Sequence, residues 1–246
     1  DMFAGAIGSS ANGYGGNITL NHNLTGGSGT VVAFGGSTNA GNIQAAPGTT
    51  VSADHIYIVG EGDVSLLGTV GTAATTSNTM KAGYNGSSFV GQHNLAIGAS
   101  TAYGANVFAE ASGAVSGAFY GTGSLTLRSV YGGVASGRAI DAAISGGVAS
   151  SVSATVDPGA TYGGVRVVST GTAPSGLVLI DHATFSNAAS FLQYGSLTVG
   201  TGGAVTAISA HDVALQSTGD MNFTASGVSL SVPSSGTALI GADGNI

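Results

Sequence analysis

The sequence contains no cysteine and no tryptophan, and charged side chains are scarce. Without cysteine the chain can form neither disulfides nor thiolate metal sites. Only 4 of its 246 residues are Lys or Arg, against 11 Asp or Glu, whereas about a quarter of the residues in an ordinary globular protein are charged. The formal net charge of −7 and the lack of any Lys/Arg cluster argue against phosphate recognition, so we expect no nucleic acid among the partners.

Long hydrophobic runs and helical patterns are also missing. No apolar run approaches the roughly 20 residues that a membrane-spanning helix needs, so we expect no transmembrane segment in this chain. Gly, Ser, Thr and Val interrupt every candidate helix within a turn. Short strand-like runs separated by corner residues fill the sequence instead. This texture predicts an all-β protein.

A five-residue pattern, Gly-x-apolar-x-apolar, recurs through the last fifty residues. Its starts step by eight, with one step of nine: Gly195, Gly203, His211, Gly219, Gly227, Gly236 and Gly244. Alternation places the two apolar side chains of each unit on one face of a short strand, and Gly suits a sharp corner. One unit cannot bury its apolar face alone, but stacked units can, which predicts a solenoid. The side chains expected to point inward are those of Leu197, Val199, Val213, Leu215, Met221, Phe223, Leu230 and Val232.

A second repeat, Gly-Gly-Val, occupies the middle of the chain at residues 132–134, 146–148 and 163–165. Around it stand Tyr-Gly-Gly-Val-Ala-Ser-Gly, Ser-Gly-Gly-Val-Ala-Ser-Ser and Tyr-Gly-Gly-Val-Arg-Val-Val. These units resemble the passenger regions of bacterial autotransporter adhesins. The later stretch Ala-His-Asp-Val-Ala-Leu-Gln-Ser-Thr-Gly-Asp-Met-Asn-Phe-Thr-Ala resembles the core repeats of filamentous haemagglutinins. Together the two resemblances cover about Tyr131 to Ile246.

Both resemblances imply a right-handed parallel β-helix that is secreted through an outer membrane. We expect about three short strands per coil, hence a coil of roughly 24 residues. Residues 131–246 are expected to form a regular repeat solenoid. Residues 1–130 are expected to form a less regular solenoid part, with a polar loop leaving it near residues 71–88.

Nucleophilic catalysis is the first chemistry that the sequence allows us to test. Three of the five histidines adjoin an aspartate, as Asp54-His55, Asp181-His182 and His211-Asp212. Adjacent residues of a strand face opposite sides, so we do not expect these pairs to hydrogen-bond as a catalytic triad does. We expect polar corner positions, with Asp capping backbone amides.

Acid catalysis and metal binding would need clustered carboxylates. The nearest approach to a cluster is Asp54, Glu61 and Asp63. Coil spacing could bring Arg138 to Asp157 or Arg166 to Asp141, as surface ion pairs. Neither a calcium nonapeptide repeat nor a dinucleotide-binding glycine motif is present. The sequence therefore predicts no catalytic residue, no cofactor site and no metal site.

Aromatic side chains gather in the middle of the chain. Four tyrosines are candidates for an exposed contact surface: Tyr103, Tyr120, Tyr131 and Tyr162. The phenylalanines of this region are expected to fill the coil interior instead.

The leading functional hypothesis is a non-catalytic, secreted cell-surface adhesin or stalk, which mediates attachment or aggregation of cells. Its partners would be copies of itself or a glycan or protein of a host or cell surface. The alternative is a self-assembling subunit of an extracellular filament or surface layer. The third hypothesis is a polysaccharide-active β-helix enzyme.

Overall fold

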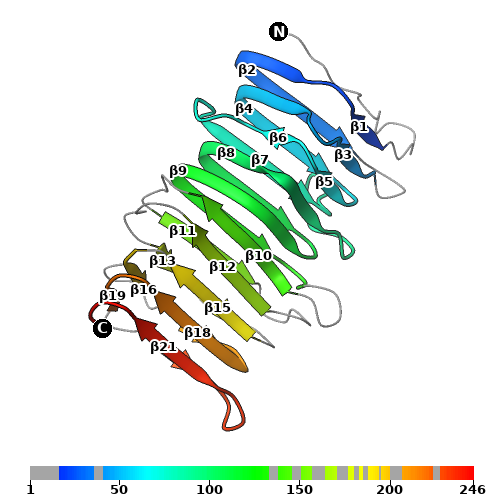
Figure 1. The fold of residues 1–246 in the computed structure, drawn as a ribbon. Helices are drawn as coiled ribbons and strands as arrows, with labels where there is room; N and C mark the ends of the chain where they lie inside the picture. Colours follow the sequence, from blue (N-terminus) through cyan, green and yellow to red (C-terminus); the bar gives the residue numbers. More distant parts are fainter. Residues whose placement is uncertain are drawn as a thin grey trace.

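The protein is a stack of parallel β-strands (Figure 1). Within the residues that the structure describes, all regular secondary structure is strand, and no helix there is long and apolar enough to cross a membrane. The computed structural model describes residues 17–35, 41–132, 138–145, 151–156, 164–170, 177–179, 183–184, 188–193, 195–199, 207–223 and 228–246.

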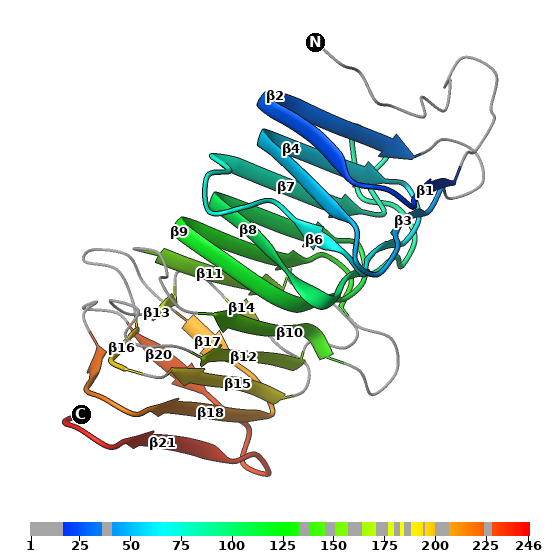
Figure 2. The ribbon, with the colours of Figure 1, turned by 45° about the horizontal axis from the view of Figure 1, so that its top comes forward.

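One ladder of parallel strands runs the length of the stack (Figures 1 and 2). In its C-terminal part Val165, Ala189, Val213 and Ala238 are in register, 24 or 25 residues apart. The predicted coil length and the predicted β-solenoid are thus confirmed. The ladder comprises β1 (Ile18–Leu20), β3 (Ile43–Ala45), β5 (Val64–Leu66), β8 (Leu95–Ala111), β9 (Val115–Ser129), β10 (Arg138–Ser145), β12 (Gly164–Thr170), β15 (Ala188–Gln193), β18 (Asp212–Ser217) and β21 (Ala238–Ala242).

The C-terminal coils contain three short strands each, as predicted. Two further ladders lie beside the long one there, so that β15, β16 and β17 complete one coil before β18 begins the next. Their strands are β13 (Leu177–Leu179), β16 (Leu197–Val199) and β19 (Met221–Phe223) in one ladder, and β14 (Ala183–Thr184), β17 (Ala207–Ser209) and β20 (Ser229–Ser231) in the other.

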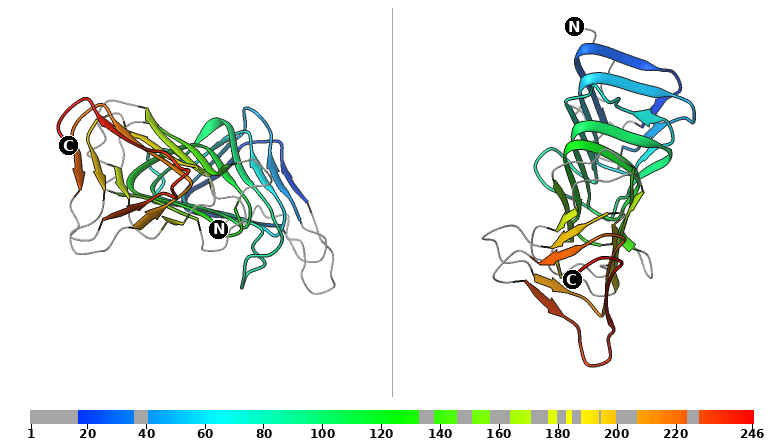
Figure 3. Two further views of the ribbon diagram at one scale, coloured as in Figure 1. Left: turned by 90° about the horizontal axis from the view of Figure 1, so that it is seen from below. Right: turned by 60° about the vertical axis from the view of Figure 1, so that its left-hand side comes forward.

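The N-terminal coils are built differently, because long strands turn the corners without a break. The register between β8 and β9 shifts between Ala96 and Thr101 and again between Gly104 and Asn106, where the strands bend. The turned view in Figure 3 shows the chain winding around the interior at this end of the stack. The other strands here are β2 (Leu24–Gly35), β4 (Thr50–Gly60), β6 (Thr69–Val70), β7 (Ser77–Ala82) and β11 (Ser151–Val156). The predicted division into residues 1–130 and 131–246 stays a prediction.

The interior is one continuous cluster of buried apolar side chains. Of the side chains predicted to point inward, Leu197, Val199, Val213, Leu215 and Met221 are buried, while Leu230 and Val232 pack against the cluster at its margin. Phe223 is 39% exposed, so the prediction of a buried ring is wrong there. It lies on β19, the last strand of its ladder, and no described strand stacks beyond it.

Two of the corner glycines predicted from the repeat show why Gly is needed. Gly195 has a φ of +105°, a backbone conformation that side chains disfavour. A Cβ atom at Gly236 would clash with the carbonyl oxygen of His211 in the preceding coil. These corners therefore admit no side chain, because the backbone turns or approaches its neighbour too closely.

The loop predicted near residues 71–88 is wrong for its middle, where β7 forms. The sequence does not indicate this strand, because the polar residue Asn78 occupies an inward position at which an apolar residue is expected. The Asn78 side chain is buried beside apolar residues. Its Nδ2 donates to the carbonyl oxygens of Val70 at 3.2 Å and Tyr103 at 3.0 Å. The segment that leaves the stack is 83–94, between β7 and β8.

Candidate functional site

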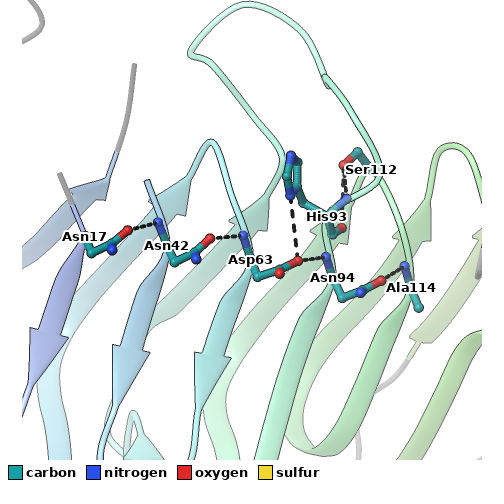
Figure 4. Close-up of polar contacts among 7 residues, drawn as sticks. All are labelled: Asn17, Asn42, Asp63, His93, Asn94, Ser112 and Ala114. Atoms are coloured by element: carbon teal, nitrogen blue, oxygen red, sulfur yellow. Dashed lines mark hydrogen bonds and ion pairs between the residues drawn. The ribbon is translucent and has the colours of Figure 1, made fainter. Parts of the chain in front are cut away.

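Asparagine and aspartate side chains form a ladder along one corner of the N-terminal coils (Figure 4). Each stands immediately before the first inward residue of a strand, and its Oδ1 accepts the backbone N–H of the equivalent residue in the next coil. Asn17 accepts from Asn42 at 3.0 Å, Asn42 from Asp63 at 2.8 Å, Asp63 from Asn94 at 2.7 Å and Asn94 from Ala114 at 2.9 Å. The side chains thereby satisfy amides that the strand ladder leaves unpaired at the corner.

The same arrangement returns in the C-terminal coils. Asp212 Oδ1 accepts the N–H of Thr237 at 2.9 Å, and Asp220 Oδ1 accepts that of Asn245 at 2.9 Å. The prediction that Asp caps a corner amide is confirmed at Asp212. The pKa of the Asp212 carboxyl is held below its usual value by two hydrogen bonds, one from the His211 side chain and one from the Thr237 amide. The Asp181-His182 pair lies outside the described residues.

The sequence contains a pattern that predicts this ladder, but a search for Gly-x-apolar-x-apolar does not detect it. It is an Asn or Asp followed by apolar-x-apolar, as in Asn17-Ile18-Thr19-Leu20 and Asp63-Val64-Ser65-Leu66. The third ladder residue is Asp63, and its Oδ1 also lies 3.7 Å from His93 Nδ1. The His93 amide donates to Ser112 Oγ at 2.9 Å (Figure 4). These contacts fasten the returning end of segment 83–94 to the corner.

The ladder predicts a measurable stability effect. Replacing Asn94 with Ala should lower the free energy of unfolding by about 1 kcal/mol, because the Ala114 amide loses its acceptor. Asn222, exposed on the outside of β19, is the matched control, and its replacement with Ala should change stability by less than about 0.5 kcal/mol. Urea denaturation followed by circular dichroism measures both. Equal losses in the two variants would show that the ladder contributes nothing specific.

The expectation that adjacent His and Asp residues do not contact each other is wrong for His211 and Asp212, which lie 3.0 Å apart, and for Asp54 and His55. The register between β2 and β4 is irregular at the corner of Asp54 and His55, and the irregularity turns both side chains outward. His55 Nε2 lies 3.4 Å from Asp54 Oδ2, and His55 Nδ1 lies 2.8 Å from Ser77 Oγ. A hydrogen bond from the Thr76 hydroxyl lowers the pKa of the Asp54 carboxyl.

This Ser-His-Asp set stands on an open surface. An adjoining hollow of about 330 Å³ is lined by Thr25, Gly27, Ser28, Ser52, Ala53, Asp54 and Ala74. Of the three side chains in the set, Asp54 lines the hollow, whereas the Ser77 hydroxyl is on the neighbouring strand β7.

The candidate acid cluster has no shared site. Asp54 is engaged with Thr76 and His55, and Asp63 is engaged with Asn94 and His93. Glu61 follows directly after β4. In the part of the chain that the structure describes, no group of three or more His, Cys, Asp or Glu could hold a metal ion.

Lys81, Glu110 and Arg128 are in register on β7, β8 and β9. Lys81 Nζ lies 2.7 Å from Glu110 Oε2, and Arg128 Nη1 lies 3.7 Å from Glu110 Oε1. The Glu110 side chain is only 15% exposed. One carboxylate thus lies between two cations on the outer side of the stack.

Segment 83–94 carries a small aromatic hairpin over these charges. Tyr84 and Phe89 form an antiparallel bridge, and their ring centroids are 5.1 Å apart. Lys81 Nζ lies 4.6 Å from the Tyr84 ring centroid, and the Arg128 guanidinium lies 5.6 Å from that of Phe89. The Tyr131 hydroxyl donates to the Phe89 carbonyl at 3.1 Å. Cation–π contacts and this hydrogen bond hold the hairpin down.

The second pair of cations surrounds Asp141. Arg166 Nη2 lies 2.6 Å from Asp141 Oδ1, so the predicted contact between these residues is confirmed. Arg138 Nη1 also contacts Asp141, at 3.1 Å. Asp157, the predicted partner of Arg138, lies outside the described residues. Each of the four Lys and Arg residues of the chain therefore contacts a carboxylate.

The predicted tyrosine surface is divided between two places. Tyr103 and Tyr120 are in register on β8 and β9, with ring centroids 5.3 Å apart, and both are half-buried. Tyr131 belongs to the aromatic hairpin contact instead. Tyr162 lies outside the described residues.

Sequence reasoning missed the most exposed aromatic side chains on the long strands. Phe108, expected inside, is 38% exposed, and Tyr57 is 37% exposed. Both point outward, because the inward positions beside them belong to Val107 and Ala109, and to Ile56 and Ile58.

No protein family matches the sequence, and no curated protein and no solved structure shows significant similarity to it.

Proposed function

We propose that this chain is a non-catalytic, secreted adhesin-type β-solenoid, which serves as a rigid stalk and contact surface for attachment or aggregation of cells. One observation carries the proposal. The outward side of the neighbouring strands β2, β4, β7, β8 and β9 presents Val32, Tyr57 and Phe108 to solvent, each more than a third exposed. Exposed apolar side chains that gather on one surface are typical of interaction sites, whereas single scattered ones are not.

Rigidity supports the same proposal. Parallel strands that hydrogen-bond from coil to coil and corner amides capped by side chains fix each coil on its neighbours. Such a body holds its contact surface in a fixed position and orientation. The resemblance of residues 131–246 to adhesin repeats points to the same class of protein and to an extracellular location.

Attachment is directly testable. Beads coated with the purified chain should bind several-fold more bacterial or host cells than beads coated with a folded, inert protein of similar charge. Light microscopy or flow cytometry counts the bound cells. Binding no greater than that of the inert control on every cell type tested would overturn the proposal.

The alternative, a self-assembling filament subunit, is favoured by β21. Within the residues that the structure describes, this strand pairs with β18 alone, and its Leu239 and Ile240 are exposed. A strand edge of this kind can pair with another chain. Electron microscopy of the purified chain separates the two functions, because continuous fibres support the filament and single rods of fixed length support the stalk.

A further inference from the structure

Five outward-facing side chains on neighbouring strands of the N-terminal stack are in register. We name them the aromatic row: Val32, Tyr57, Thr79, Phe108 and Thr126, on β2, β4, β7, β8 and β9. Figures 1 and 2 show these strands side by side. The row crosses the strands, so it runs along the axis of the solenoid.

Aromatic rings and threonines alternate along this row. Tyr57 and Phe108 are two strands apart, which corresponds to ~9.6 Å at the usual strand spacing of ~4.8 Å. Thr79 lies between the two rings, and Thr126 follows Phe108. Two sugar residues of an extended, β-linked polysaccharide span about the same distance, so alternate sugar rings would meet alternate coils.

The flanks of the row differ in chemistry. On one side lies a line of hydroxyl, amide and imidazole groups in the same register, namely Thr30, His55, Ser77, Asn106 and Ser124. On the other side stand Lys81, Glu110 and Arg128 beneath the aromatic hairpin. The aromatic row therefore lies between a line of polar side chains on one side and the charged residues covered by the aromatic hairpin on the other.

The charge of this face distinguishes between classes of ligand. The five strands contain two cations, Lys81 and Arg128, and two carboxylates, Asp54 and Glu110, so their formal net charge is zero. The whole chain carries −7. An uncharged ligand suits such a face, whereas the field of the rest of the protein repels a polyanion.

We infer that the aromatic row binds a neutral, extended β-linked polysaccharide that lies along the solenoid axis. The apolar faces of sugar rings stack on Tyr57 and Phe108, and the hydroxyls of Thr79, Thr126 and the polar line hydrogen-bond the sugar hydroxyls. This inference rests on the proposed function and names the ligand class of its contact surface.

Pull-down of the full chain on insoluble polysaccharides tests the inference. Cellulose and chitin are the neutral β-linked probes, and immobilised polygalacturonate is the acidic one. The chain should bind at least one neutral probe and be left in solution by polygalacturonate. Combining Tyr57→Ala with Phe108→Ala should weaken the Kd by at least about tenfold. Tyr57→Phe should bind like the unchanged chain, because the ring is kept.

Leu67→Ala is the matched control, because Leu67 is a similarly exposed apolar side chain outside the row. Circular dichroism and thermal melts check that each variant folds. No binding to either neutral probe, equal or stronger binding to polygalacturonate, or an unchanged Kd in the double variant overturns the inference. If coated beads still attach to cells in any of these cases, the polysaccharide assignment fails and the proposed adhesin function stands. If attachment also fails, both are wrong.

Discussion

Replacing Phe119 with Ala is expected to lower the free energy of unfolding by about 3–5 kcal/mol. The ring is fully buried, and Phe119 lies in the first half of β9. The residue in register on β8 is Ala102, a small side chain that leaves room for the ring but cannot fill its place. The cavity left by the Phe119 ring would therefore persist. Each coil contacts only its two neighbours, so few surrounding side chains can move to fill that cavity. Urea denaturation followed by circular dichroism measures the effect.

A second phenylalanine in the same region provides the control. Phe108 has the same chemistry but points outward, so its replacement with Ala should lower the free energy of unfolding by less than about 1 kcal/mol. Phe119→Leu, which keeps most of the apolar volume, should cost about 1–1.5 kcal/mol. Similar losses for Phe108→Ala and Phe119→Ala would contradict the assignment of inward and outward faces.

The coil architecture could be predicted where the alternation of apolar and polar residues runs without interruption through each strand and restarts at each corner. In the C-terminal coils each strand is short and ends at a corner, so Leu197, Leu215 and Met221 each follow a fresh start of the pattern. Gly at two of those corners, Gly195 and Gly219, is a second and independent signal. Period-2 alternation together with a regular restart is enough to specify a stack of parallel strands.

The full length of the long strands was not predicted, because these strands continue through the corners of the coil and do not end there. In β8 the phase of the alternation changes between Ala96 and Thr101 and again near Gly104, although the pairing continues. A period-2 search therefore finds only fragments there. Asn78 misleads in the opposite way, because a polar residue in an inward position is read as part of a loop until its two backbone acceptors are known.

The candidate site depends on which residues of different coils share a row, and the sequence does not fix this in the N-terminal half. Along the aromatic row the separations are 25, 22, 29 and 18 residues from Val32 to Tyr57, Thr79, Phe108 and Thr126. Corner loops of unequal length produce this irregularity. By contrast, Arg166 and Asp141 are 25 residues apart, one regular coil, and their contact was predictable.

Replacing Glu110 with Gln should lower the free energy of unfolding by about 2 kcal/mol. Breaking a buried ion pair from one side costs about 3–5 kcal/mol, and the exposure of Arg128, at 38%, reduces the figure through solvent screening. Lys81 and Arg128 would lose the carboxylate between them. Their cation–π contacts, with Tyr84 and Phe89 respectively, would still keep the two cations close together. Because like charges repel less in salt, the loss should shrink between low and high ionic strength.

Two further variants separate repulsion from lost packing. Adding Lys81→Met to Glu110→Gln removes one of the two cations that face position 110, so the double variant should be more stable than Glu110→Gln alone. Asp141→Asn is the matched control, because Asp141 also lies between two cations, Arg138 and Arg166, but in a more exposed setting. Its replacement should cost about 1 kcal/mol or less. Equal losses at Glu110 and Asp141, with no salt dependence, would mean that the hairpin-covered cluster is held by packing alone.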